Sequence, residues 1–213
     1  MMNTLSIEKL YESQQTLLDM LKTKQDVFAK IKTVNYPLIV KWQMMLGVLL
    51  PIQFEILKKI GFTNEQTALI EYNAQLMQTQ KDDQKLRELN EAKWNYIFEQ
   101  AFDITSVQKI SQEQALALIK DISIEMMSEN FLKQVDAFMA KLDPNMPLIE
   151  KRQHLLTLLI PMQMSVMSKH GFAGEQGYVQ AQKALMEYLH EPQMIEQASK
   201  AQIALFTRAG LMG

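Results

Sequence analysis

Apolar residues recur along most of the chain at spacings of three and four, the period of an amphipathic α-helix. The first such segment runs from about Thr4 to Lys32, with Ile7, Leu18 and Phe28 on one face. Later in the chain, Ser111 and Gln114 have the spacing of an N-terminal capping box and begin another helix. No segment shows the strict alternation typical of a strand. The pattern predicts an all-α protein of eight helices, four in each half of the chain.

Two long apolar segments are similar to each other. PLIVKWQMMLGVLLPIQFEILKKIGF spans Pro37–Phe62, and PLIEKRQHLLTLLIPMQMSVMSKHGF spans Pro147–Phe172. At an offset of 110, residues 37–66 and 147–176 are identical at 14 of 30 positions. Such self-similarity predicts two pseudo-repeated four-helix units, residues 1–102 and 103–213, which form a helical bundle. We expect the units to pack tightly together or to form one domain.

Each long segment carries a proline in its middle, Pro51 in the first and Pro161 in the second. A proline inside a helix removes one backbone donor and clashes with the carbonyl four residues earlier, at a cost of about 3 kcal/mol. The sequence therefore predicts two kinked central helices, Pro37–Ile60 and Pro147–His170. The kinks are bracketed by four glutamines: Gln43, Gln53, Gln153 and Gln163. These amides satisfy freed carbonyls or bridge to a neighbouring helix, which is the favoured interpretation, or they line a ligand pocket at the kinks.

Composition excludes several classes of function. A net charge of −2 and a pI near 6.0 argue against a nucleic-acid-binding protein, which needs a basic surface. The absence of cysteine excludes disulfides and thiolate metal sites. Charged or amide residues interrupt both apolar segments, so we expect no membrane span, which needs about 20 apolar residues. The start of the chain, MMNTLSIEKLYESQQ, has no secretory pattern, and we expect a cytoplasmic protein.

Candidate catalytic chemistry is sparse. Glu187 and His190 have the i, i+3 spacing of carboxylate-bridged metal sites and are weak candidates for metal ligands. Such sites need a second motif of this kind and two further glutamates, which the sequence lacks, so we expect no metal site. Neither a GxSxG sequence nor a glycine-rich phosphate loop is present. We therefore expect no cofactor and no enzymatic activity.

Several segments resemble the small eukaryotic "protein C-ten" family. They are IQFEILKKIGF (Ile52–Phe62), GYVQAQKALMEYLHEPQMI (Gly177–Ile195) and IALF (Ile203–Phe206). Family members are short helical proteins in which a glutamine-rich apolar helix ends in Gly-Phe. A tyrosine, an acidic-proline step and a short closing helix follow. The resemblance covers about residues 40–80 and 150–207 and implies two fused units, a role in protein–protein interaction and no catalytic residues.

The expected function is that of a non-catalytic interaction or adaptor protein. Sixteen methionines are compatible with this expectation, because flexible thioethers line adaptable binding grooves as well as irregular cores. We expect a protein partner in a groove between the units, and a monomer or homodimer. One alternative is a carrier of a small apolar ligand between the kinked helices. Another is a secreted bacterial effector that binds a host protein in the host cytosol.

Overall fold

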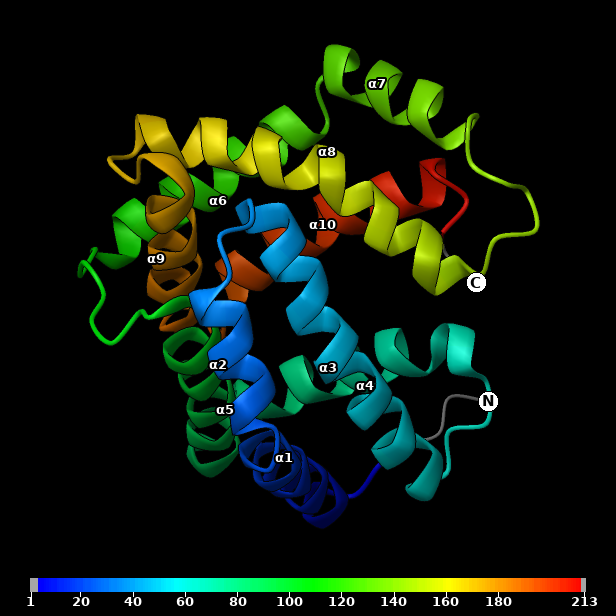
Figure 1. The fold of residues 1–213 in the computed structure, drawn as a ribbon, viewed down its shortest axis with the longest axis vertical. Helices are drawn as coiled ribbons and strands as arrows, with labels where there is room; N and C mark the ends of the chain where they lie inside the picture. The colour runs from blue at the N-terminus through cyan, green and yellow to red at the C-terminus, as the bar shows by residue number, and fades with distance from the viewer. Residues whose placement is uncertain (1–3, 212–213) are drawn as a thin grey trace. The chain divides into compact units, whose positions relative to one another are not determined.

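The computed structural model describes residues 4–211, except for the side chains of residues 65 and 66. Over this range the protein is all-α, with ten helices and no strand (Figure 1). The chain divides into two compact units, Met1–Val107 and Gln108–Gly213. Unit 1 contains α1 (Ile7–Lys22), α2 (Gln25–Thr33), α3 (Leu38–Lys59), α4 (Glu65–Gln80) and α5 (Gln84–Phe102). Unit 2 contains α6 (Gln112–Met126), α7 (Glu129–Met139), α8 (Leu148–Lys169), α9 (Gly174–Met186) and α10 (Pro192–Arg208).

Each unit has five helices, so the predicted count of four per unit is wrong. The expected helix Thr4–Lys32 ends at Thr23, whose hydroxyl donates to the Met20 carbonyl at 2.7 Å, and a second helix begins at Gln25. In unit 2 a break between two helices occurs at Ser128. This residue caps α7 by accepting a hydrogen bond from the backbone N–H of Phe131. Threonine and serine favour such breaks because their hydroxyls form hydrogen bonds with backbone groups that a continuous helix would otherwise use. The expected capping box of Ser111 and Gln114 is present at the start of α6.

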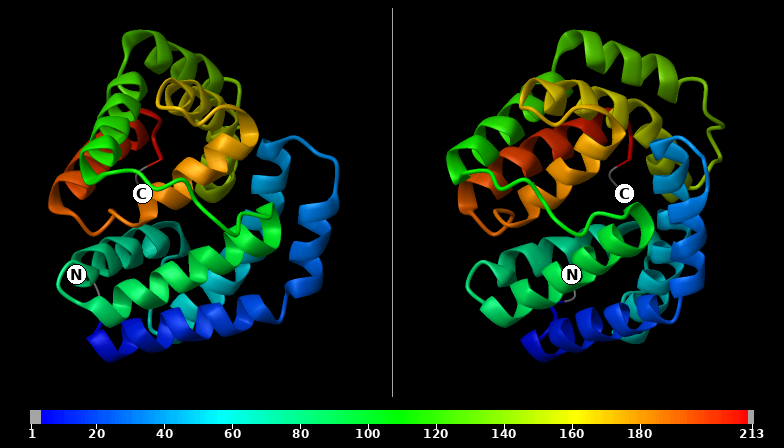
Figure 2. Two further views of the ribbon diagram at one scale, coloured as in Figure 1. Left: turned by 90° about the vertical axis from the view of Figure 1, so that its left-hand side faces the viewer. Right: turned by 60° about the vertical axis from the view of Figure 1, so that its left-hand side comes forward.

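In unit 1, α5 packs against α1 and α2, while α3 packs against α1, α2 and α4. Figure 2 shows α1 in blue running alongside α5 in blue-green. The core contains Phe28, Met45, Leu86 and Ile97, all with no exposed surface. Phe28 meets the Tyr96 ring edge-to-face, with centroids 6.0 Å apart, and this contact joins α2 to α5.

In unit 2, α8 packs against α6, α7 and α9, and α10 packs along α6. The fully buried side chains include Leu155 and Ile160 of α8, and Phe172 after it is nearly so. Gly177 of α9 lies directly on the backbone of Phe172, where a Cβ atom would stand 2.3 Å from the Phe172 carbonyl carbon. Only glycine allows this close approach of α9 to the end of α8.

The two long apolar helices, α3 and α8, have the same length and the same ends. Each has 22 residues and begins after a proline in extended conformation. Each ends at a glycine with positive φ, Gly61 at 108° and Gly171 at 89°. The next residue, Phe62 or Phe172, donates its N–H to the carbonyl five residues earlier and is buried, as in a Schellman cap. This cap is present at both Gly61–Phe62 and Gly171–Phe172, whereas a repeat of the whole unit stays a prediction.

Among residues 4–211, α3 is the one helix long and apolar enough to cross a membrane by length and composition. Of its apolar window, 28% is buried in the structure, and the buried side chains include Met45, Leu49 and Ile52. Core helices of soluble proteins meet the same criterion, so it does not by itself indicate a membrane span.

Candidate functional site

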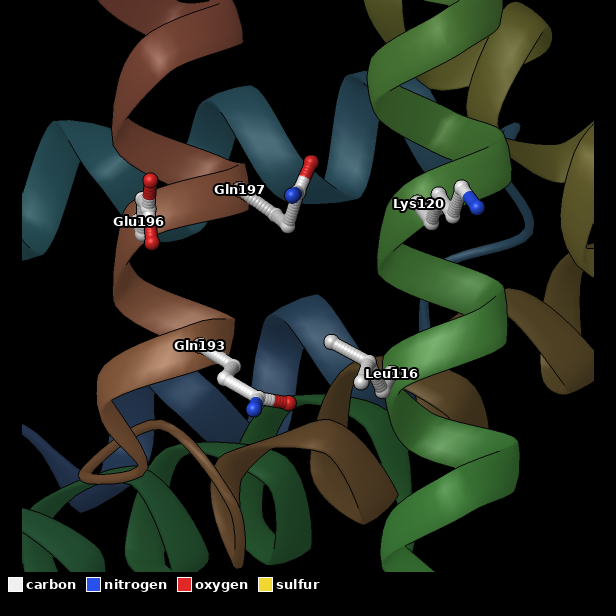
Figure 3. Close-up of a pocket in the computed structure, with 5 residues that line it drawn as sticks. All are labelled: Leu116, Lys120, Gln193, Glu196 and Gln197. Carbon is white, nitrogen blue, oxygen red and sulfur yellow. The ribbon is translucent and has the colours of Figure 1, made fainter.

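The best candidate for a binding site lies on α6 and α10 of unit 2. The inner face of α6 is buried, with Ala115, Leu118, Ile119, Ile122 and Met126 in the core. The hydroxyl of Ser123 donates to the carbonyl of Gln197 on α10 at 3.2 Å, and this bond joins the two helices. Figure 3 shows that α6 and α10 run in the same direction, because Lys120 follows Leu116 upward as Gln197 follows Gln193.

A pocket of about 350 Å³ opens between these two helices. It is lined by Leu116, Lys120, Gln193, Glu196 and Gln197. In Figure 3, Gln193 and Gln197 extend from α10 toward α6, and Leu116 extends from α6 toward Gln193. The pocket thus combines an apolar side chain, two amides and a charge of each sign.

Exposed apolar side chains lie further along the same two helices. Ile124 is 59% exposed, Met127 is 40% exposed and Ile203 is 52% exposed. Lys120, Ile124 and Met127 follow one another at spacings of four and three, so they share one face of the α6 segment. Glu196, Lys200 and Ile203 have the same spacings on α10. We call these three apolar residues and the five pocket residues the α6–α10 surface.

The two charges of this surface have different surroundings. Lys200 donates to Glu196 at 2.6 Å, and this hydrogen bond lowers the pKa of the Glu196 carboxyl. Lys120 is exposed and forms no ion pair within the described part of the chain. The surface therefore offers one positive charge that an incoming group can neutralise.

A second group of polar side chains lies in the interior of unit 1, where α1, α4 and α5 meet. Lys93 Nζ donates to Asn90 Oδ1 at 2.7 Å and to Gln14 Oε1 at 3.2 Å. Gln14 Nε2 donates to the Tyr72 hydroxyl at 2.7 Å, and this hydroxyl lies 2.6 Å from Ser13 Oγ. Lys93 is 3% exposed, and Gln14 has no exposed surface. We call these residues, together with Gln80, the Lys93 cluster.

Gln80 closes the Lys93 cluster on the α4 side. Its Oε1 accepts a hydrogen bond from Asn90 Nδ2 at 3.2 Å, and its side chain is buried. The Lys93 amine also lies 5.2 Å from the ring centre of Trp94. Burial disfavours the charged form and lowers the pKa of Lys93 to about 7.

The residues predicted at the two kinks lie in α3 and α8. Both helices continue through their prolines, and Pro51 and Pro161 are exposed. A Cβ atom at Gly47, four residues before Pro51, would meet no atom of a neighbouring helix within 4 Å.

The four glutamines around the prolines are all half-exposed: Gln43, Gln53, Gln153 and Gln163. Gln163 Oε1 accepts hydrogen bonds from the Tyr178 hydroxyl at 3.1 Å and from Gln182 Nε2 at 3.5 Å. This bridge from α8 to α9 agrees with the structural interpretation at that position. The ligand pocket at the kinks stays a prediction.

The weak metal candidates lie after α9. His190 Nε2 lies 3.4 Å from the carboxylate of its neighbour Glu191, and Glu187 is exposed. Over residues 4–211, no three histidine, aspartate or glutamate side chains gather in a way that could hold a metal ion. Glu187 and His190 therefore have no third ligand in the described structure.

Sequence reasoning missed both the exposed part of the α6–α10 surface and the Lys93 cluster. A signal existed for Ile124, since it lies two residues beyond Ile122 and off the buried face of α6. A signal also existed for Lys93, which stands four residues before buried Ile97 and seven after buried Leu86. A polar residue at such a core position indicates a buried polar group.

No family model matches the chain, and no curated protein or solved structure is significantly similar to it. The resemblance to the "protein C-ten" family therefore stays a prediction. What the protein does has to be argued from its own residues.

Proposed function

We propose that this is a non-catalytic interaction protein that binds an amphipathic helix of a partner protein on the α6–α10 surface. The observation that carries the proposal is a pocket between α6 and α10 together with exposed Ile124, Met127 and Ile203 further along these two segments. Exposed apolar side chains that gather on one region of a surface are typical of protein-binding sites. We also propose that the protein acts in the cytoplasm.

The arrangement of α6 and α10 favours a helix as the occupant. Two side-by-side helices leave a shallow furrow between their outer side chains, and an amphipathic helix lays its apolar face into such a furrow. The pocket between Leu116 and Gln193 would receive one large apolar side chain of the partner. Ile124 and Ile203 would flank the next turns.

Charge complementarity narrows the choice of partner. Glu196 is already compensated by Lys200, whereas Lys120 has no ion-pair partner within residues 4–211. An acidic side chain on the partner helix would therefore pair with Lys120. Exposed pairs of this kind contribute about 0.2–1 kcal/mol, so Lys120 would select the register of the helix more than it would strengthen binding.

The few apolar side chains that binding would bury set the expected affinity. Full burial of one large apolar side chain contributes about 1.5–3 kcal/mol. Three partly exposed side chains gain less, and the loss of free motion on association opposes them. We expect micromolar binding, which corresponds to about −8 kcal/mol. This range suits an adaptor that exchanges partners.

A displayed library of amphipathic helical peptides tests the proposal. It would be selected on the wild-type protein after depletion on Ile124→Glu, and the binding of enriched peptides would be measured by calorimetry. We expect apolar anchors with an acidic residue, and at least tenfold weaker binding to Ile124→Glu and Ile203→Glu. The control is Val27→Glu, since Val27 is an exposed apolar residue of α2, at 38% exposure. Equal binding to all variants, or no enriched peptide, would contradict the proposal.

A further inference from the structure

The hydrogen bonds of the Lys93 cluster have a single direction. Ser13 Oγ donates to the Leu10 carbonyl at 2.9 Å, and this bond uses the only proton of the serine hydroxyl. The Tyr72 hydroxyl therefore donates to Ser13 and accepts from Gln14 Nε2. This fixes the Gln14 amide with its oxygen toward Lys93. In this series of hydrogen bonds, the donor is always the group nearer to Lys93, and Lys93 itself only donates.

The number of acceptors around Lys93 matches a neutral amine. An ammonium has three N–H donors, whereas a neutral amine has two donors and a lone pair. Two oxygens accept from Nζ, one from Asn90 and one from Gln14. The third N–H of an ammonium would have only the face of Trp94, 5.2 Å from Nζ to the ring centre, as a weak partner.

In the described part of the chain, no carboxylate of the neighbouring helices forms an ion pair with Lys93. On α4, burial raises the pKa of Tyr72, so this phenol stays neutral. On α2, Phe28 faces Tyr96 of α5, whose pKa burial also raises. Asp83, at the start of α5, caps that helix and accepts a hydrogen bond from Tyr11 of α1.

Two basic groups near the start of α5 are engaged elsewhere. Arg87 donates to the carbonyls of Gln80 and Lys81 at 2.9 and 2.8 Å, and Lys85 lies over the Tyr11 ring. Within the described residues, Lys93 forms no ion pair with an aspartate or glutamate. A charge buried without a carboxylate is costly, so the interior of unit 1 favours the neutral amine.

We propose that Lys93 is a neutral hydrogen-bond donor in folded unit 1, and that its protonation acts as a switch that loosens α1 from α4 and α5. The charged amine would need a third acceptor or water, and α1 covers it through Gln14. Burial places the pKa of Lys93 at about 7, so the switch would work near neutral pH. The proposal does not depend on the α6–α10 surface, which belongs to unit 2.

The sign of the pH dependence follows from the two pKa values. An unfolded chain holds the lysine proton up to a pKa of about 10.4. Between about pH 7 and pH 10 the unfolded state therefore binds one more proton than the folded state. Stability rises with pH in this window, and the unfolding equilibrium constant falls about tenfold per pH unit through this group. Below about pH 7 the group is charged in both states, and its contribution to the slope ends.

A direct test is nuclear magnetic resonance of the full chain with isotope-labelled lysines. We expect the ε-methylene signal of Lys93, identified by its loss in Lys93→Met, to titrate near pH 7, well below the pKa of about 10.4 of a lysine in an unfolded chain. After correction for intrinsic exchange rates, amides of α1 should exchange faster at pH 6 than at pH 8.5. Titration of Lys93 with the pKa of about 10.4 of an unfolded chain would overturn the proposal.

A second test compares denaturation across pH 6–10. Wild type and Lys59→Met, a control on an exposed ion pair with Glu55, should share one pH dependence. Lys93→Met should lack the tenfold-per-unit component between pH 7 and pH 10. Parallel curves for all three proteins would refute the switch. If Lys93→Met does not fold, the wild-type titration decides alone.

Discussion

The hydroxyl groups of Ser13 and Tyr72 lie 2.6 Å apart in the interior of unit 1, although 59 residues separate them. Both side chains are buried, and Gln14 reaches the same phenol oxygen from the next position of α1. Three polar groups thus satisfy one another where water is excluded. This contact connects α1 to α4 by polar chemistry in addition to apolar packing, and it makes the interior of unit 1 sensitive to single-atom changes.

Removal of the Tyr72 hydroxyl tests this connection. Tyr72→Phe leaves the Gln14 Nε2 donor and the Ser13 oxygen without their partner in a buried site. A buried unsatisfied group costs about 1–3 kcal/mol, so we expect the free energy of unfolding to fall by that amount in urea denaturation. Tyr36, at 52% exposure, provides the control, and Tyr36→Phe should change stability by less than about 0.5 kcal/mol. A Tyr72→Phe protein as stable as wild type would show that the cluster does not stabilise the fold.

The helices were predictable because their signals are local. The apolar period and the capping box at Ser111 each depend on a few neighbouring residues, and both are present. The break at Thr23 was not predicted. The apolar period continues across this break, and the hydrogen bond of the Thr23 hydroxyl that ends α1 competes only weakly with helix continuation.

The candidate sites were less predictable because they depend on which helices pack together. Leu116 and Gln193 line one pocket although 77 positions separate them in the sequence, and only the pairing of α6 with α10 brings them together. The prolines indicated a candidate pocket on α3 and α8, whereas the exposed apolar residues of the α6–α10 surface lie elsewhere. Lys93 had a sequence signal, but its partner Gln14 could not be inferred without the fold.

Two glycines allow a matched test of packing. At Gly177 an added Cβ would lie 2.3 Å from the backbone of Phe172, so Gly177→Ala forces α9 away from α8. We expect a loss of about 1–3 kcal/mol, as for overpacked cores. Gly47→Ala should instead stabilise the protein by about 0.5–1 kcal/mol, because it meets nothing within 4 Å and alanine favours helix. Thermal melts of both variants measure this, and equal effects would contradict the packing at Gly177.

Adjacent methionines of α3 allow a second matched test. Met45 has no exposed surface, whereas Met44 is 36% exposed. Truncation of Met45 to alanine should cost about 2–5 kcal/mol through lost burial and a residual cavity. Met44→Ala should cost less than about 1 kcal/mol, because more than a third of this residue is already exposed in the folded state. Urea denaturation of the two variants distinguishes them. Equal losses would mean that α3 is inserted with a different face toward α1 and α4.

Acid titration tests the link between α1 and the start of α5. The Tyr11 hydroxyl donates to Asp83 at 2.5 Å, and this bond is the main cause that lowers the pKa of the Asp83 carboxyl. Because the folded-state pKa lies below that of the unfolded chain, the stabilisation is present above about pH 4 and is lost as the pH falls through the folded pKa. Tyr11→Phe should therefore raise the pKa of Asp83 and reduce stability at pH 7, with the difference from wild type disappearing in acid.

The control for this titration is Asp136, whose pKa is lowered by a hydrogen bond from Arg208 in unit 2. Carboxyl carbon shifts followed by nuclear magnetic resonance should show that Tyr11→Phe moves Asp83 and leaves Asp136 unchanged. Arg208→Gln should do the reverse, because each carboxylate depends on a different donor. If Asp83 kept its low pKa in Tyr11→Phe, the cap on the Leu86 N–H would have to be the main cause, and α1 would not be held to α5 at this point.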